Sequence, residues 1–85
     1  MNWELRIDAS VRKALRRFPK HDAERLIAVI EELPANPYAG DIEKMKGEAN
    51  SWRRRVGSYR IFYELRIAEK IVYIYDTERR TSHIY

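Results

Sequence analysis

Four arginines in one short segment carry the chemistry that this sequence offers. The segment is SWRRRVGSYRIFY, residues 51–63, and it holds Arg53, Arg54, Arg55 and Arg60. A guanidinium group stays protonated at any physiological pH and donates paired hydrogen bonds to phosphate oxygens. Such a local excess of positive charge indicates a polyanionic partner, either a nucleic acid or an acidic protein segment.

The arginines are separated by the alternation of side chains along a strand. Residues 52–57 and 59–66 read as two strands of a hairpin joined at Gly57-Ser58. Alternation then places Arg53 and Arg55 on one side and Arg54 on the other. Arg60 lies opposite its apolar neighbours and joins Arg53 and Arg55 if the hairpin register allows it. We therefore expect mutation of Arg54 to affect activity least.

The aromatic residues and the remaining cations leave alternatives open. Base stacking often accompanies backbone charge in RNA recognition, and the tyrosines are candidates for it: Tyr59, Tyr63, Tyr73, Tyr75 and Tyr85. The three consecutive arginines could equally be a charged edge strand that blocks aggregation. The basic face of the first helix, which holds Arg12, Lys13, Arg16 and Arg17, either contacts RNA phosphates or is an ordinary solvated surface.

Composition excludes several classes of site. The 85 residues carry a net charge of +4, all of it from residues 43–85, which hold ten Lys/Arg against six Asp/Glu. Without cysteine there are no disulfides or thiolate metal sites, and two isolated histidines give no metal centre. No nucleotide fingerprint or hydrolase triad occurs, so we expect no cofactor. Apolar runs of at most five residues predict no membrane span, and no signal peptide is visible, so a cytoplasmic location is expected.

The elements that must position the arginines follow from apolar spacing. An opening strand at 3–7 precedes a helix capped by Asp8 or Ser10 and a second helix between Pro19 and Pro34. A loop spans residues 34–50, with an extended piece near 44–46. Three antiparallel strands follow at 52–57, 59–66 and 70–76. We predict one α+β domain over residues 1–85, in which the N-terminal strand and the helical hairpin pack on one face of a small antiparallel sheet.

Three motifs resemble the RelE/ParE superfamily of type II toxin–antitoxin toxins, and the similarity covers almost the whole chain. They are KMKG at 44–47, WRRRVGSYRIFY up to residue 63, and the C-terminal ERRTSHIY. The resemblance implies a RelE-like fold and a ribosome-dependent endoribonuclease, or mRNA interferase. By the same resemblance the catalytic positions are Arg53, Arg55, Arg60, Arg79 and Tyr85, with RNA-binding residues Lys44, Lys46, Arg80 and His83.

The implied reaction is attack of a ribose 2′-OH on the adjacent phosphate, which leaves a 2′,3′-cyclic phosphate and a 5′-OH. Strand positions that are lysine in well-known members are arginine here, and arginine is a poor general base because it stays protonated. The base is then Tyr85, His83, the terminal carboxylate or a group of the ribosome. We favour Tyr85, because neighbouring arginines would lower its pKa.

The resemblance also implies partners and competing functions. The expected partners are a cognate antitoxin, the ribosome and mRNA, with DNA contacted only through the antitoxin and no membrane. One alternative is a ParE-like inhibitor of DNA gyrase, against which the presence of Arg60, Arg79 and Tyr85 argues. Another is a degenerate toxin that only binds its antitoxin.

Overall fold

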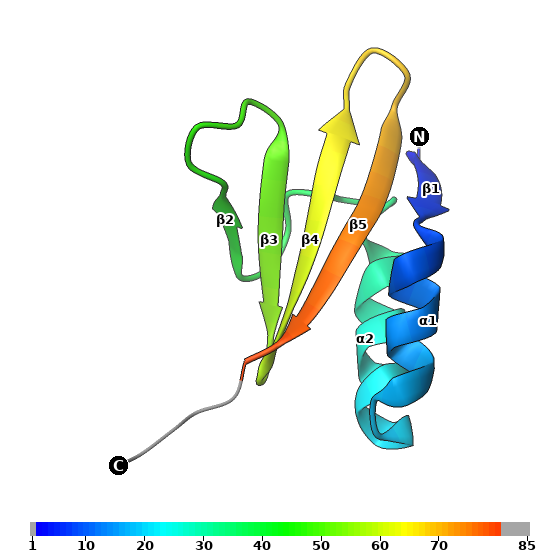
Figure 1. Cartoon of the computed structure of the whole chain (residues 1–85). Helices are drawn as coiled ribbons and strands as arrows, with labels where there is room; N and C mark the ends of the chain where they lie inside the picture. Colours follow the sequence, from blue (N-terminus) through cyan, green and yellow to red (C-terminus); the bar gives the residue numbers. More distant parts are fainter. Residues whose placement is uncertain (1, 81–85) are drawn as a thin grey trace.

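A helical hairpin covers one face of a five-stranded sheet (Figure 1). The computed structural model describes residues 2–80. The elements run in the order β1 (Glu4–Ile7), α1 (Ala9–Arg17), α2 (Lys20–Glu32), β2 (Ile42–Lys44), β3 (Ser51–Val56), β4 (Tyr59–Arg66) and β5 (Ile71–Arg79). The strand order is β1-β5-β4-β3-β2, in which β1 pairs parallel with β5 and the other pairs are antiparallel. The predicted α+β architecture is confirmed, with β5 extending three residues beyond its predicted end. The N-terminal strand, however, is an edge strand of the sheet itself, parallel to β5, and not part of the layer that packs on its face.

Capping and apolar spacing determine the two helices. Asp8 is the N-cap of α1 and accepts a hydrogen bond from the Ser10 amide at 3.0 Å. Pro19, which cannot continue α1, precedes the first residue of α2. The buried stripes contain Val11, Leu15, Ala23, Leu26 and Ile30. Ile27 has the same helical spacing but is 39% exposed, so the buried face of α2 is narrower than its apolar pattern. Neither helix in the described part of the chain is long and apolar enough to cross a membrane.

Replacing Asp8 with alanine is expected to lower stability at neutral pH. The Ser10 hydroxyl, the Tyr73 hydroxyl and the Ser10 amide all donate to the Asp8 carboxylate and lower its pKa. A lowered folded-state pKa means that this stabilisation is complete above the unfolded value of about 3.9 and is lost as pH falls through the folded-state pKa. Urea midpoints of wild type and Asp8→Ala should therefore differ at pH 7 and converge in acid. The exposed Glu69→Ala is the control; an equal gap at both pH values would contradict the prediction.

The core lies between the helices and one face of β4. Tyr59, Ile61, Tyr63 and Leu65 alternate along β4 and are each at most 5% exposed. The Phe18 ring from the end of α1 packs on Tyr59, with ring centroids 4.9 Å apart. Tyr59 and Tyr63 therefore pack inside the protein, and the prediction that their faces are free for base stacking is wrong. Burial of the two rings is favourable even though it takes their hydroxyl groups out of water, because each hydroxyl forms a hydrogen bond inside the protein. Tyr59 donates to Asp22, and Tyr63 donates to the Pro37 carbonyl oxygen.

A β-bulge interrupts the pairing of β4 with β5. Phe62 pairs with Asp76 whereas Tyr63 pairs with Ile74, so Tyr75 has no partner of its own on β4. An extra residue of this kind shifts the alternation of every later side chain on its strand. Downstream of Tyr75, Asp76 and Glu78 lie on the open face and Thr77 and Arg79 on the helix-facing side.

Candidate functional site

A cluster of arginines lines a pocket on the open face of the sheet. We call it the arginine pocket; its residues are Asp41, Glu43, Arg53, Arg55, Arg60 and Arg80. Arg55 and Arg60 are direct cross-strand partners, and Arg53 lies two residues from Arg55 on the same side of β3. The predicted convergence of Arg53, Arg55 and Arg60 on one face is confirmed, whereas their part in catalysis stays a prediction.

The hairpin turn sets this register. Gly57 adopts φ +59°, a left-handed conformation that residues with a side chain rarely adopt. Val56 and Tyr59 pair directly across the turn, so the loop holds only Gly57 and Ser58. A two-residue loop fixes the pairing of every residue behind it. The turn therefore places Arg55 opposite Arg60, a juxtaposition of like charges that needs compensation.

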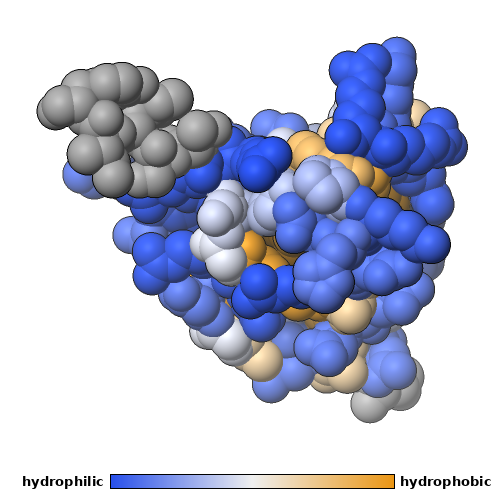
Figure 2. All heavy atoms as spheres, turned by 90° about the horizontal axis from the view of Figure 1, so that it is seen from below, coloured by the Kyte–Doolittle hydropathy of each residue, from blue (hydrophilic) through white to orange (hydrophobic). Residues whose placement is uncertain are grey.

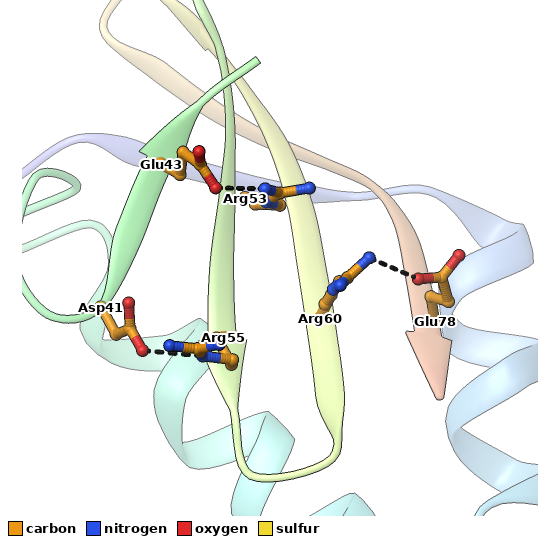
Figure 3. Close-up of polar contacts among 6 residues, drawn as sticks. All are labelled: Asp41, Glu43, Arg53, Arg55, Arg60 and Glu78. Carbon is orange, nitrogen blue, oxygen red and sulfur yellow. Dashed lines mark hydrogen bonds and ion pairs between the residues drawn. The ribbon is translucent and has the colours of Figure 1, made fainter. Parts of the chain in front are cut away.

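Three carboxylates provide that compensation (Figure 3). Asp41 pairs with Arg55 at 2.9 Å, Glu78 pairs with Arg60 at 3.3 Å, and Glu43 pairs with Arg53. Arg60 is the most enclosed of the three arginines, with 23% of its side chain exposed, against 58% for Arg55. The three ion pairs are exposed to solvent, so each contributes only about 0–1 kcal/mol and can be exchanged for a stronger anion.

Arg54 lies on the other side of β3, as alternation predicted. Its Nη1 donates to the Ala39 carbonyl oxygen at 3.3 Å, and its guanidinium lies directly against the Cα atom of Gly40. A Cβ atom at Gly40 would lie 2.4 Å from the Arg54 Cζ, so glycine is needed for this passage. The predicted separation of Arg54 from Arg53 and Arg55 is confirmed, and its contacts indicate a structural role.

Arg79, which the resemblance assigns to the catalytic positions, does not line the arginine pocket. It pairs with the buried Tyr59, and its guanidinium lies 5.7 Å from the centre of the Tyr59 ring on the helix-facing side. The bulge at Tyr75 is the reason, because it shifts the alternation by one residue. Arg80, predicted only as an RNA-binding residue, lines the pocket instead.

The other predicted residues are divided between separate regions. Lys44 pairs with Trp52 and so lies on the helix-facing side of β2; Lys46 follows it, and both border a shallow hollow of the β2–β3 loop. Tyr73 and Tyr75 are half-buried on the open face, where their hydroxyls bond to Asp8 and Ser51. His83 and Tyr85 lie outside the described residues.

Sequence reasoning missed the three carboxylates of the site. Asp41 and Glu43 are two residues apart, and Glu78 is two residues before Arg80, which is the spacing of side chains that share one face of a strand. For Asp41 and Glu43 this signal is hidden, because the two prolines and two glycines of residues 34–50 favour a loop. The site holds four arginines and three carboxylates. The two carboxylates that line the pocket, Asp41 and Glu43, each already pair with an arginine. The pocket therefore suits an anion rather than a metal cation.

Comparison with known proteins places this geometry in context. The family described as ParE toxin of type II toxin–antitoxin system, parDE, matches residues 5–82. The RelE1 protein of Methanocaldococcus jannaschii is 29% identical over 83 residues, which cover 94% of this chain and 92% of that protein. The RelE–RelB complex of Pyrococcus horikoshii OT3 aligns with TM-score 0.83 and 26% identity, over 98% of this chain and 100% of that one. The isolated RelE toxin of E. coli shares the fold, with TM-score 0.81 and 17% identity over 95% and 87%.

Proposed function

This chain belongs to the ParE toxin family, within the RelE/ParE superfamily of type II toxin–antitoxin toxins, and we propose that it is a ribosome-dependent endoribonuclease that cleaves translated mRNA. The observation that carries the proposal is the convergence of Arg53, Arg55, Arg60 and Arg80 in one pocket. Four guanidinium groups at one place suit a reaction in which negative charge builds up on a phosphate.

The proposed reaction is intramolecular transfer at the RNA phosphate. The ribose 2′-oxygen forms a bond to phosphorus, and the bond from phosphorus to the 5′-oxygen of the next nucleotide breaks. A base takes the proton of the 2′-OH, and a proton is delivered to the leaving 5′-oxygen. Arg55 and Arg60 face each other across the hairpin and would donate to the phosphate oxygens. As negative charge develops on the phosphate, each guanidinium would give up its ion pair with its carboxylate and bind the phosphate instead.

The group that takes the proton has to come from outside the arginines. Tyr85 and His83 remain candidates, together with the terminal carboxylate and a group of the ribosome. Asp41 and Glu43 are further candidates because they lie in the arginine pocket itself. A carboxylate released from its arginine by phosphate would be free to accept a proton.

A cognate antitoxin is the expected protein partner. The solved relative from Pyrococcus horikoshii is a RelE–RelB complex. An antitoxin segment would either cover the arginine pocket or displace catalytic elements, and DNA would be contacted through the antitoxin alone. Because translated mRNA is the proposed substrate, the toxin would act in the cytoplasm on ribosomes.

The experiment that tests this function is inducible expression in bacteria with mapping of mRNA 5′ ends during growth arrest. We expect new 5′ ends inside translated reading frames, carrying a 5′-OH. Intact mRNA during arrest would contradict the proposal. An in vitro translation reaction programmed with one defined mRNA separates direct cleavage from secondary decay.

Two other functions have specific support. The description of the matching family names the ParE toxin, which favours inhibition of DNA gyrase. Growth arrest with intact mRNA and a loss of supercoiling activity would show this function. The ion pairs of Arg53, Arg55 and Arg60 with their own carboxylates favour a degenerate toxin that only binds its antitoxin. Expression without growth arrest would identify that case.

Removal of the pocket carboxylates is expected to strengthen RNA binding. In the Asp41→Asn/Glu43→Gln variant, phosphate no longer competes with these two carboxylates for Arg55 and Arg53. Affinity for a short single-stranded oligoribonucleotide should rise by roughly two- to thirtyfold, because two ion pairs of about 0.2–1 kcal/mol each are removed. Fluorescence anisotropy measures it. Glu64→Gln is the matched control, because Glu64 pairs with Arg66 outside the pocket.

The same variant separates binding from proton transfer. Weaker RNA binding would contradict competition and show instead that the carboxylates orient the arginines. Tighter binding with a cleavage rate reduced by tenfold or more would identify one of the two carboxylates as the base. Tighter binding with an unchanged rate leaves proton transfer to the remaining candidates.

A further inference from the structure

A second pocket lies on the helix-facing side of the sheet, beside the β3–β4 turn. We call it the turn pocket; the residues used below are Asp22, Arg25, Gly57, Ser58, Tyr59 and Arg79. Figure 2 shows the molecule from this end, where hydrophilic side chains surround an opening onto apolar atoms. The pocket holds about 140 Å³. About 10–15 Å³ of such cavity volume holds one water molecule, so the pocket has room for a group of several heavy atoms such as phosphate.

Arg79 is held in place above Tyr59. Its guanidinium lies 5.7 Å from the ring centre, a cation–π contact. The Tyr59 hydroxyl donates to Asp22 at 2.7 Å. Burial and this hydrogen bond raise the pKa of Tyr59, so the hydroxyl stays protonated and occupies the Asp22 carboxylate. Within residues 2–80, Arg79 has no carboxylate within ion-pair distance, in contrast to Arg53, Arg55 and Arg60.

Arg25 approaches the same space from α2. A Cβ atom at Gly57 would lie 2.9 Å from the Arg25 Nη1, so the guanidinium lies directly against the turn. Arg25 likewise forms no ion pair with any described residue. In the described part of the chain, the amides of Gly57 and Ser58 donate no hydrogen bond, although the Ser58 carbonyl accepts one from Arg80. Two guanidinium groups and the two turn residues Gly57 and Ser58 thus line one pocket, with Asp22 as its acidic residue.

We propose that the turn pocket binds a backbone phosphate of RNA, as a site separate from the arginine pocket. Guanidinium forks and free turn amides are the donors that phosphate oxygens use in proteins. Arg79 and Arg80 are consecutive and lie on opposite faces, so the end of β5 has one arginine in each pocket. An RNA strand that passes around this end of the sheet contacts both. The proposal rests on the proposed RNA-cleaving function and assigns Arg79 to binding rather than to catalysis.

The test measures RNA binding and cleavage separately in Arg25→Ala and Arg79→Ala. The binding probe is a single-stranded oligoribonucleotide, titrated at several salt concentrations. We expect each variant to bind about three- to tenfold more weakly, with the slope of log K against log salt reduced by about 0.7, the value for one lost phosphate contact on a single strand. In cleavage, KM should rise while kcat stays within about twofold. Arg6→Ala is the matched control, because this exposed arginine lies on β1, away from the turn.

Binding to vacant ribosomes distinguishes the two sources of phosphate. A loss confined to the oligoribonucleotide assigns the pocket to mRNA, and a loss confined to ribosomes assigns it to ribosomal RNA; either supports the proposal. Thermal unfolding of each variant confirms that it is folded, and Arg79→Lys, which keeps the charge, should recover part of the affinity.

Three results would overturn the proposal. Arg6→Ala could weaken binding as much as the pocket variants, which would show an effect of net charge alone. Arg79→Ala could abolish kcat with unchanged affinity, which would return Arg79 to the catalytic residues. Poly-L-glutamate could compete as well as RNA of equal length, which would indicate an acidic protein segment as the occupant. A wild-type protein that cleaves no mRNA would remove the proposed function, while the binding measurements would still decide whether the pocket holds phosphate.

Discussion

Replacing Arg60 with alanine is expected to reduce mRNA cleavage by about a hundred- to a thousandfold, the effect of removing one preorganised donor to a developing oxyanion. Arg60 is the most enclosed ion-paired arginine of the pocket, faces Arg55 across the hairpin and pairs with Glu78. No other described residue of β4 stands in a position to replace it, because its neighbours Tyr59 and Ile61 point into the core. Cleavage of a defined mRNA in a translation reaction measures the effect, and growth arrest on expression should disappear.

A matched control separates position from charge. Arg66 lies on the same strand and face, pairs with Glu64 and stacks 4.8 Å above the centre of the Tyr73 ring, outside the arginine pocket. Arg66→Ala should therefore retain activity within a few fold, and Arg54→Ala, if folded, should lose least among the arginines of β3. Arg60→Lys keeps the charge without the fork and should show an intermediate rate. Equal losses in Arg60→Ala and Arg66→Ala would contradict the assignment of the pocket.

Replacing Tyr63 with alanine is expected to cost about 3–5 kcal/mol of stability, a large part of the roughly 5–15 kcal/mol that a small domain has. Tyr63 is fully buried in the centre of β4, and its hydroxyl donates to the Pro37 carbonyl oxygen at 2.6 Å. Alanine would leave a cavity and an unpaired carbonyl oxygen. Urea unfolding followed by circular dichroism measures the change. A cost below about 1 kcal/mol would show that the loop before β2 collapses into the space.

The Tyr63 hydroxyl is also expected to make the protein less stable in alkali. Burial raises its pKa to about 12, from an ordinary value near 10. The folded state therefore keeps a proton that the unfolded chain releases, so the stabilisation is complete below about pH 10 and is lost as pH rises from about 10 to about 12. Tyr63→Phe should weaken this dependence, without abolishing it, because the pKa values of Tyr59 and Tyr73 are raised as well. An unchanged alkaline profile in Tyr63→Phe would contradict the assignment.

The helical hairpin and the three long strands were predictable because local signals agree with the tertiary structure. Asp8, Pro19 and Pro34 bound the helices through capping and the loss of a backbone donor. The short connection at Gly57-Ser58 left β3 and β4 no arrangement except an antiparallel pair. The strand β2 begins about two residues before the extended piece predicted near residues 44–46. A strand of three residues is too short to show a periodic pattern in the sequence.

The arginines of β3 and β4 show what the sequence determined by itself. Alternation within a strand is a property of the backbone, and a two-residue turn transfers that alternation to the next strand. Arg53, Arg55 and Arg60 could therefore be assigned to one face from the order of the residues alone. The same reasoning separated Arg54 from them.

The end of β5 shows what only the tertiary structure decided. Regular alternation from Tyr73 would place the Arg79 side chain on the open face. The bulge at Tyr75 shifts the alternation by one residue, so Arg79 lies on the helix-facing side and Arg80 on the open face. The bulge lets Ile74 pair with Tyr63 and Thr77 pair with Ile61, both buried residues of β4, so it depends on the neighbouring strand and no pattern within β5 predicts it. The carboxylates Asp41, Glu43 and Glu78 likewise reach the arginines only through neighbouring strands, because their charges are brought together by sheet register and not by distance along the chain.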